Sequence, residues 1–522
     1  MNKKKQLSIM ITIAILVGAT VFLTTIFNDK KFSESRNTET TQEIKTTSPE
    51  TYLSEVFTEK NTVKETTTYM NNKSPKSKTT IQDFYKKENA VVCHAAGIIN
   101  GHNVTNSVEA LNKNYAQGYR FFEVDLSLTS DGYLVCSHGW TKKEYIARYM
   151  DNYNLCLNKE EYCPSLNEFR TFTVGDGYTV LTFKDFINWM NNHDDTCFLL
   201  DIKLCDRKEA KSIAETIIRE GGKEILDRFV VSARTTEMAK GFSDAYKFPY
   251  MHLLYDTDEM REKSIYTPAL FVEFCKQYNI SSFSLEMNDC TTETIKALSV
   301  SGMKSYVYMI QNNYQANNIL KTGVNYLISD YLDTNTIEKT IKKHSAFIQL
   351  SDQKAQGIAI EWTCDKPIKK VTIYRKSENS YGFEKLVNLS GDTNKYLDNS
   401  IDLGKLYEYY VEVHATDGST INSCVEKYAC LEIPELVHVV KQNNSVEIKW
   451  NKIEGADGYY IRKKIGSDGE YQLVRIIDDP TAIQYVDEDG FSDDTTFYSV
   501  RCFKVIDEYR YTGTYSKGML VE

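Results

Sequence analysis

The chain has 522 residues, so we expect two to four domains rather than one. Hydrophobic residues make up 41% and charged residues 26% of it, which excludes a wholly disordered or collagen-like protein. The net charge of −10 argues against a basic nucleic-acid-binding surface, and we expect no nucleic-acid partner. The 12 cysteines form no CxxC pair, so neither a zinc finger nor a small disulfide scaffold is expected.

Residues 1–30 predict a transmembrane or export segment. Lysines at positions 3–5 precede an uncharged run from Leu7 to Phe27, whose 21 residues are enough to cross a bilayer as a helix. The lysines favour the cytoplasmic side, which leaves the rest of the chain outside. A cleaved signal peptide is the alternative, although the run is long for one. The prediction is a protein anchored to the membrane on its extracellular face, or a secreted one if the segment is cut.

Residues 31–88 predict a disordered stalk. Between positions 31 and 80 there are 13 Thr and 6 Ser, no Gly, and no apolar period. Such a segment cannot bury enough apolar surface to offset the entropy that its chain would lose on folding. We expect it to act as a tether between the membrane segment and the folded domains.

Residues 89–342 alternate short β-branched or aromatic runs with helical patterns, which predicts a parallel sheet. The candidate strands are Ala90–His94, Arg120–Leu126, Tyr133–His138, Cys197–Ile202, Phe229–Ser232, Tyr250–Leu254, Ser282–Leu285, Ser305–Met309 and Tyr326–Ser329. The candidate helices are Ser107–Gln117, Phe183–Asn191, Arg207–Gly221, Pro268–Tyr278 (with Thr267 as its cap), Thr292–Ser301 and Ala316–Thr322. About eight strands over about 250 residues fit a (β/α)8 TIM barrel, whose catalytic residues lie at the C-terminal ends of its strands.

Ionisable side chains gather at the ends of these predicted strands. The set comprises two histidines, three carboxylates and a lysine: His94, His138, Glu123, Asp125, Asp201 and Lys203. Glu123 and Asp125 are two residues apart on one strand, so they share a face. Asp201 and Lys203 share a face of another strand for the same reason.

This set predicts phosphodiester chemistry. Carboxylates that share the inside of a barrel repel one another and lose solvation, so they need a cation. Oxygen ligands favour Ca²⁺ or Mg²⁺ over zinc. That cation and Lys203 would neutralise the charge that develops on a phosphoryl group, and the two histidines would supply a base and an acid. Taken singly, each residue has a structural alternative, such as an ion pair between Asp201 and Lys203.

Several short motifs occur in a specific order along this region. They are His94-Ala95-Ala96-Gly97, Thr105-Asn106-Ser107-Val108-Glu109-Ala110-Leu111, the run from Gly118 to Gly132, Val135-Cys136-Ser137-His138, and the run from Gly323 to Asp330. In order and spacing they resemble the glycerophosphodiester phosphodiesterase family, which belongs with the phosphatidylinositol-specific phospholipase C-like barrels. The resemblance covers about residues 89–340 of this chain.

The resemblance implies a role for each residue of the set. It implies His94 and His138 as the acid–base pair, Glu123, Asp125 and Asp201 as ligands of a divalent metal cation, and Lys203 and Asn106 as substrate-binding residues, with Asn106 orienting the site. The implied substrate is a glycerophosphodiester or a phospholipid headgroup. Its glycerol hydroxyl would attack its own phosphorus, and water would then open the cyclic phosphate.

The chain departs from the family pattern at four positions. Ala95 stands where the family has Arg, Thr105 replaces a Glu, Gly139 replaces the Asp after the second histidine, and Asp201 is one methylene shorter than the family's Glu. Two alternatives therefore stay open. One is a catalytically degenerate barrel that acts as a surface binding or adhesion protein. The other is a metal-independent lyase like phosphatidylinositol-specific phospholipase C. The retained histidines and carboxylates favour a phosphodiesterase.

Residues 140–180 form an insertion between two predicted barrel strands, and we expect it to shape the substrate pocket. It contains Cys156 and Cys163, which could pair in an oxidising environment. Three further cysteines lie in predicted strands and are expected to be apolar packing residues: Cys93, Cys136 and Cys197.

Residues 343–434 and 435–522 are two copies of one pattern. Trp362 precedes Tyr396-Leu397-Asp398 by 34 residues, and Trp450 precedes Tyr485-Val486-Asp487 by 35. Short alternating strands around a tryptophan predict β-sandwiches, and both copies resemble fibronectin type III modules. A spacer or adhesion role is favoured over a defined cell-surface ligand site. The expected class is α/β: a (β/α)8 TIM barrel followed by two all-β sandwich domains, behind the transmembrane helix and the stalk.

Overall fold

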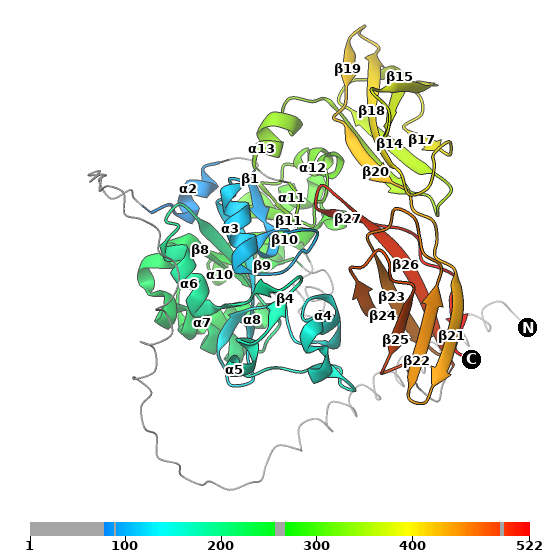
Figure 1. Cartoon of the computed structure of the whole chain (residues 1–522). Helices are drawn as coiled ribbons and strands as arrows, with labels where there is room; N and C mark the ends of the chain where they lie inside the picture. The colour runs from blue at the N-terminus through cyan, green and yellow to red at the C-terminus, as the bar shows by residue number, and fades with distance from the viewer. Residues whose placement is uncertain (1–77, 88–89, 256–266, 333, 491–494) are drawn as a thin grey trace, which may run out of the picture. The chain divides into compact units, whose positions relative to one another are not determined.

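The computed structural model describes residues 78–87, 90–255, 267–332, 334–490 and 495–522 (Figure 1). The predicted transmembrane segment and most of the predicted stalk lie outside these ranges, so neither prediction is tested there. Within the described ranges, no helix combines the length and the apolar character needed to cross a bilayer.

Eight parallel strands close into a barrel in the described part of the chain, as predicted. Their spatial order is β1, β12, β11, β10, β9, β8, β7 and β2, and β1 also pairs with β2. The bounds are β1 (Ala90–Cys93), β2 (Phe121–Leu128), β7 (Cys197–Ile202), β8 (Phe229–Ala233), β9 (Met251–Leu254), β10 (Ile280–Glu286), β11 (Lys304–Tyr308) and β12 (Tyr326–Ser329).

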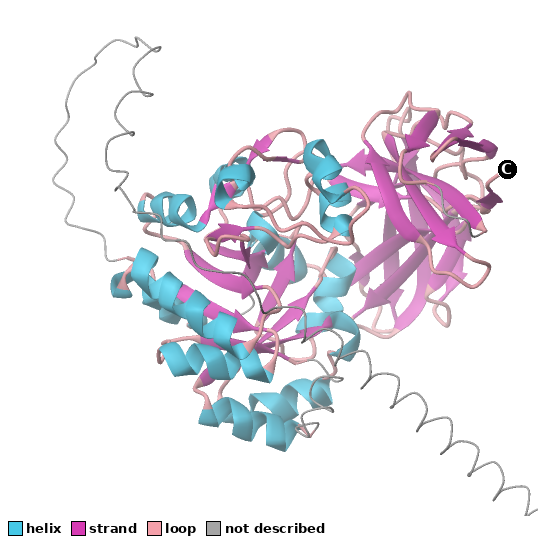
Figure 2. Cartoon of the chain, turned by 90° about the horizontal axis from the view of Figure 1, so that it is seen from below, coloured by secondary structure: helices cyan, strands magenta, loops and turns pink. Residues whose placement is uncertain are grey.

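Helices lie outside these strands (Figure 2). They are α3 (Val108–Ala116), α6 (Phe183–Asn191), α7 (Arg207–Gly221), α8 (Thr236–Ala245), α10 (Pro268–Gln277), α11 (Thr292–Leu298), α12 (Asn313–Leu320) and the short α13 (Thr334–Thr336). The predicted start of α10 is confirmed, because the Thr267 side chain accepts a hydrogen bond from the amide of Leu270. Helix α8 was not predicted.

Alternate residues of β2 enter two different apolar clusters. Phe122 and Val124 pack outward in the cluster that includes the helices, whereas Phe121 packs inward. The inward cluster also receives Ile81 and Phe84 of α2 (Ile81–Tyr85). Residues 78–87 were predicted as stalk, and that part of the prediction is wrong, because Ile81 and Phe84, three residues apart on one helix face, are buried here.

The run Tyr133–His138 does not supply a barrel strand. Its central part, β3 (Leu134–Cys136), pairs antiparallel with β2, and β6 (Leu181–Thr182) pairs antiparallel with β3. The tight turn at Gly132 (φ 82°) is too short for a parallel connection, so the chain can only fold back. The insertion that follows contains α4 (Lys142–Ala147), α5 (Leu166–Phe169), β4 (Thr173–Val174) and β5 (Tyr178–Thr179).

All 12 cysteines lie in the described ranges, and every one of them is a free thiol. The suggested pairing of Cys156 with Cys163 is therefore absent. Instead, the Cys163 thiol donates to the carbonyl of Leu128. The three strand cysteines, Cys93, Cys136 and Cys197, are buried, as predicted.

The C-terminal region forms four sheets that are compatible with two fibronectin type III-like modules. The first pair contains β13 (Ala346–Asp352), β14 (Ile358–Cys364) and β17 (Lys395–Asp398), then β15 (Ile368–Ser377), β16 (Glu384–Ser390), β18 (Leu406–Ala415), β19 (Thr420–Asn422) and β20 (Glu426–Ala429). The second pair contains β21 (Leu436–Gln442), β22 (Ser445–Trp450) and β25 (Gln484–Asp487), then β23 (Gly458–Ile465), β24 (Gln472–Ile477), β26 (Thr496–Ile506), β27 (Tyr509–Thr512) and β28 (Met519–Leu520). Trp362 and Trp450 are buried, one in each core.

Candidate active site

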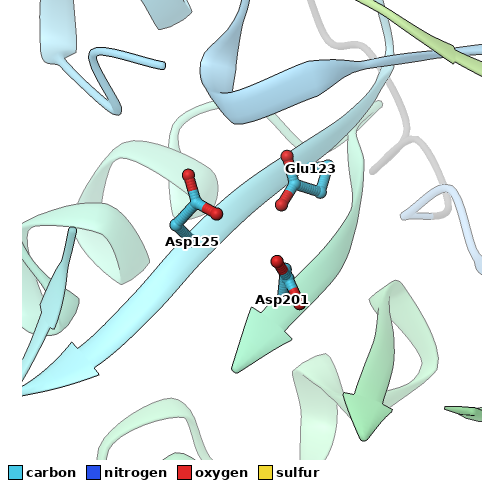
Figure 3. Close-up of side chains that lie close together, drawn as sticks. All are labelled: Glu123, Asp125 and Asp201. Atoms are coloured by element: carbon cyan, nitrogen blue, oxygen red, sulfur yellow. The ribbon is translucent and has the colours of Figure 1, made fainter. Parts of the chain in front are cut away.

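Three carboxylates meet inside the barrel, as the sequence predicted. Glu123 and Asp125 project from the inner face of β2, and Asp201 projects from β7, where it is the register partner of Asp125. Figure 3 shows the three groups pointing toward one another. One oxygen of each lies within 4.8 Å of the others.

This group fits a hard divalent cation by two observations. Its donors are all carboxylate oxygens, which suit Ca²⁺ or Mg²⁺. In addition, one oxygen of each group lies close enough to the others for the three to share one ion, and Asp125 already has a cationic neighbour in the Lys203 ammonium. Carboxylates buried this close together repel one another, so positive charge between them is stabilising.

Burial and charge shift the carboxylates in opposite directions. Burial, and then repulsion from Asp125, raises the pKa of Glu123. Burial opposes ionisation of Asp125 as well, but the nearby Lys203 lowers the pKa of Asp125 below its usual range. The pKa of Asp201 is also lowered, because Lys203 and Arg234 outweigh the effect of burial. The site thus combines Glu123, whose neutral form is favoured by its raised pKa, with Asp125 and Asp201, whose lowered pKa values favour the charged form.

His94 is held at the end of β1 by a carboxylate that the sequence analysis did not assign. Its Nδ1 lies 2.8 Å from Oδ1 of Asp330, and its Nε2 lies 3.9 Å from Glu123. Burial disfavours the charged imidazole, but the charges of Asp330 and Glu123 outweigh it and raise the pKa of His94 to about 9. Asp330 directly follows β12 and closes the motif that runs from Gly323, but no role was predicted for it.

The backbone after His94 is arranged around Glu123. Ala95 and Ala96 have φ of 46° and 70°, in the left-handed region that costs a residue with a Cβ about 1–2 kcal/mol. In this conformation the amide of Ala95 donates to Oε2 of Glu123 at 2.6 Å. Gly97 (φ 91°) is required for another reason, since a Cβ there would lie 2.3 Å from the Asn114 side chain.

Asn106 lies behind the site and not in it. Its Nδ2 donates to Oδ2 of Asp125 at 2.7 Å, and its Oδ1 accepts from the amide of Asp125 at 2.9 Å. The side chain is 1% exposed, and it does not line the cavity described below. These are contacts that an orienting residue would make, and they do not reach the cavity; the orienting and substrate-binding roles of Asn106 both stay predictions.

Two positively charged side chains and both histidines of the predicted acid–base pair line one cavity. Lys203 Nζ lies 2.6 Å from Asp201, and Arg234, just after β8, donates from Nη2 to the same carboxylate at 2.5 Å. The cavity is about 210 Å³ and draws its lining from the C-terminal ends of barrel strands. Its polar lining includes His94, Glu123, His138, Asp201, Lys203, Arg234 and His252.

Two members of this lining, Arg234 and His252, were not selected from the sequence. Arg234 follows a predicted strand end but belongs to no motif. His252 lies in the middle of a strand, is buried, and shares a hydrogen bond of 3.0 Å between its Nδ1 and Ser282. Both are recognisable only once the strands are placed around one cavity.

Residues 99–334 match a family model described as "Glycerophosphoryl diester phosphodiesterase family". This range covers most of the barrel. The match supports the prediction of a phosphoric diester hydrolase. The matched range includes the acidic group, His138 and Lys203, but it begins after His94, whose place in the site therefore rests on the coordinates. No curated protein matches the chain.

Several solved structures are similar to parts of the chain. A putative glycerophosphoryl diester phosphodiesterase from Silicibacter pomeroyi is 15% identical, with a TM-score of 0.41 over 47% of this chain and 90% of that chain. The enzyme from Thermotoga maritima is 17% identical, with a TM-score of 0.36 over 48% and 99%. The FN1–FN3 domains of chicken CNTN1 are 18% identical, with a TM-score of 0.17 over 34% and 64%.

Proposed function

We propose that the barrel is a metal-dependent phosphodiesterase that hydrolyses glycerophosphodiesters and releases glycerol phosphate and an alcohol. The observation that carries this proposal is that His94 and His138 line the same cavity as Glu123 and Asp201. The family match over residues 99–334 supports the same substrate class. A phosphodiesterase from Oleispira antarctica, 15% identical to this chain, was solved with the product sn-glycerol-3-phosphate.

In the proposed reaction one histidine takes the proton of a substrate glycerol hydroxyl, whose oxygen then attacks the phosphorus. The second histidine gives a proton to the leaving alcohol, and water opens the resulting cyclic phosphate. Lys203 and Arg234 bring positive charge to the phosphoryl oxygens, where negative charge develops. A divalent cation held by Glu123, Asp125 and Asp201 would add further stabilisation of that charge.

The test is cleavage of glycerophosphodiesters by the purified protein with Ca²⁺, with Mg²⁺ and with EDTA. We expect the substitutions His94→Ala and His138→Ala each to lower the rate by about 10²-fold or more, because each removes a proton-transfer group. His438→Ala is the matched control, since that imidazole pairs with Glu447 in the second sandwich. Full activity in either barrel variant would contradict the acid–base assignment.

A metal-free lyase is the second candidate, because one observation favours it. Lys203 and Arg234 already neutralise Asp201, and Lys203 also lies against Asp125, as a metal ion would. Such an enzyme would keep its activity in EDTA and stop at the cyclic phosphate. Phosphorus NMR of the products separates the two reactions. An absence of cleavage with every diester would instead favour the alternative of a catalytically degenerate barrel that acts as a surface binding protein.

We further propose that the barrel is exported and anchored on the extracellular face of the membrane by residues 1–30. The support is the lysine triplet and the 21-residue uncharged run that follows it. The sandwiches would then act as spacers or bind a cell-surface ligand. Protease added to intact cells should digest the barrel, and a barrel that stays protected until the cells are lysed would contradict export.

A further inference from the structure

The insertion after β3 places a buried carboxylate, that of Glu144, next to His138. Glu144 lies in the first turn of α4 and is 7% exposed. Its Oε1 lies 3.1 Å from Nδ1 of His138, and its Oε2 accepts from the guanidinium of Arg148. With Nδ1 directed at Glu144, Nε2 is the ring nitrogen that remains for the cavity that His138 lines.

An apolar core inside the insertion fixes the position of α4. Tyr145 and Tyr149 are buried in a cluster with Phe169 and Phe172. The Thr141 side chain caps the helix by accepting a hydrogen bond from the amide of Glu144. Because Tyr145, the next residue of α4, packs in this aromatic core, Glu144 cannot move away from His138 without disturbing the core.

The insertion is also fastened to the strands that carry the site. The hydroxyl of Tyr149 donates to Ser137 at 2.9 Å, directly beside His138. The indole of Trp140 donates to the carbonyl of Leu128, the last residue of β2, at 2.7 Å. The carboxylate of Glu144 is therefore positioned relative to the same strand that carries Glu123 and Asp125.

Glu144 is suited to remain an anion in this position. Burial would favour its neutral form, but the hydrogen bond with His138 and the charge of Arg148 lower the pKa of Glu144. The arrangement repeats what Asp330 does for His94, where a buried carboxylate also contacts Nδ1. The two carboxylates come from unrelated elements, α4 in the insertion and the end of β12.

We propose that Glu144 is a positioning residue that fixes the tautomer and orientation of His138. By accepting a hydrogen bond from the Nδ1–H group, the Glu144 carboxylate keeps the proton on Nδ1 and leaves Nε2 unprotonated toward the cavity, ready to take a proton from the substrate. The effect on rate rests on the proposed function, whereas the tautomer itself does not. The insertion thus contributes to the site through Glu144, although none of its described residues lines the cavity.

The first test reads the tautomer directly. In the whole chain labelled with ¹⁵N-histidine, the His138 signals are assigned by their loss in His138→Ala and measured at about pH 8.5, where an ordinary imidazole is neutral. We expect the Nδ1-protonated form in the native protein and a mixture in Glu144→Gln, because an amide can either accept from Nδ1 or donate to it. An unchanged tautomer in Glu144→Gln would overturn the proposal, whatever happens to the rate.

Glu168→Gln is the matched control from the same insertion. Glu168 accepts from Ser165 at the start of α5 and from the hydroxyl of Tyr162, and none of its hydrogen bonds involves His138. The same chemical change there should leave the His138 tautomer and the turnover unaltered. If both substitutions shift the tautomer alike, the effect comes from loosening the insertion, and the specific role of Glu144 is rejected.

The second test is kinetic. We expect Glu144→Gln to lower kcat by about 10²-fold with little change in KM, since the residue acts on a proton-transfer group and does not bind substrate. In a His138→Ala background the same substitution should have no further effect. An equal loss in both backgrounds would show an independent structural role and would overturn the proposal. If the native protein cleaves no diester, the proposed function fails, and the tautomer measurement still tests whether Glu144 positions His138.

Discussion

Each of the two histidines proposed for proton transfer contacts a carboxylate that belongs to another element. Asp330 is 236 residues after His94, and yet their side chains are 2.8 Å apart. The strained turn at Ala95 directs an amide at Glu123, and Asn106 uses both ends of its amide on Asp125. At this scale the site is a set of oriented pairs, and orientation is what proton transfer and ion binding require.

It was predictable that the side chains of Glu123 and Asp125 share one face of β2, because the side chains of successive strand residues alternate between the two faces whatever surrounds them. The pairings made by Asp330, Arg234 and Glu144 were not predictable, because they depend on the distance to side chains on other elements. Asp330 closes one of the quoted motifs, but the motif does not reveal which side chain it contacts.

His252 gives a prediction at the residue scale. Burial lowers its pKa to about 3, whereas the unfolded chain takes up this proton near pH 6.5. Between those values the unfolded state binds one more proton than the native state, so stability falls as the pH falls. From pH 6.5 to pH 5 we expect a loss of about 2 kcal/mol in the free energy of opening of β9 and β10.

Hydrogen exchange of the β9 and β10 amides at several pH values measures this loss. In His252→Gln the opening free energy of these strands should depend less on pH between pH 6.5 and pH 5, because the titrating group is gone. His438→Gln, with its side chain 37% exposed, is the control and should leave the slope unchanged. An identical slope in native protein and His252→Gln would show that other groups cause the acid sensitivity.

At the scale of elements, the strands and most helices followed from their periodicity, and the exceptions have identifiable causes. The run Tyr133–His138 has a strand pattern, but its short turn makes it fold back on β2. Helix α8 was overlooked because Gly241 weakens its helical pattern. In the fold that glycine lies against α7, where a Cβ would be 2.3 Å from the carbonyl oxygen of Arg207.

Gly241→Ala is the prediction at this scale. The added Cβ would also lie 2.8 Å from Cβ of Ala210, so α7 and α8 must separate. Although alanine favours a helix, we expect a net loss of about 1–3 kcal/mol from overpacking. Gly382→Ala, where a Cβ would meet nothing within 4 Å, is the control. Thermal unfolding and hydrogen exchange of the α7 and α8 amides measure the loss, and a more stable Gly241→Ala variant would refute the packing argument.

The repeated Tyr-x-Asp motif also acquires its meaning between elements. In the first sandwich Asp398 accepts from the hydroxyl of Tyr409 at 2.8 Å and from Arg375 at 2.9 Å. In the second, Asp487 accepts from Tyr498 at 2.7 Å and from Lys463 at 3.0 Å. A buried carboxylate that receives a hydroxyl and a cation joins the two sheets of each module, which explains why both copies carry the motif.

At the scale of the whole molecule, the barrel and the two sandwiches each have a separate buried cluster. A ligand that binds only one of them should therefore stabilise that one. Binding to the native state alone stabilises by about 2.7 kcal/mol when the free ligand is at 100 times its Kd.

We expect Mg²⁺ or Ca²⁺ to raise the Tm of the barrel transition in calorimetry of the whole chain, and EDTA to reverse the rise. The reason is that a cation would relieve the repulsion among Glu123, Asp125 and Asp201. Asp201→Asn should abolish the shift, whereas Glu447→Gln in the second sandwich should not. A barrel Tm that is unaffected by millimolar amounts of either ion would reject metal binding and favour the lyase.

The sequence by itself determined the alternation of strands and helices, the duplicated sandwich pattern, and the six ionisable residues proposed for the site. These features depend on periodicity and on spacing along the chain, which are local properties. Only the tertiary structure decided which charged groups face one another: Asp330 with His94, Glu144 with His138, and Arg234 with Asp201. Two of those contacts arise because the barrel brings the ends of different strands together, and the contact of Glu144 arises because the insertion folds α4 against His138. Electrostatic interactions depend on distance in space rather than on separation in sequence.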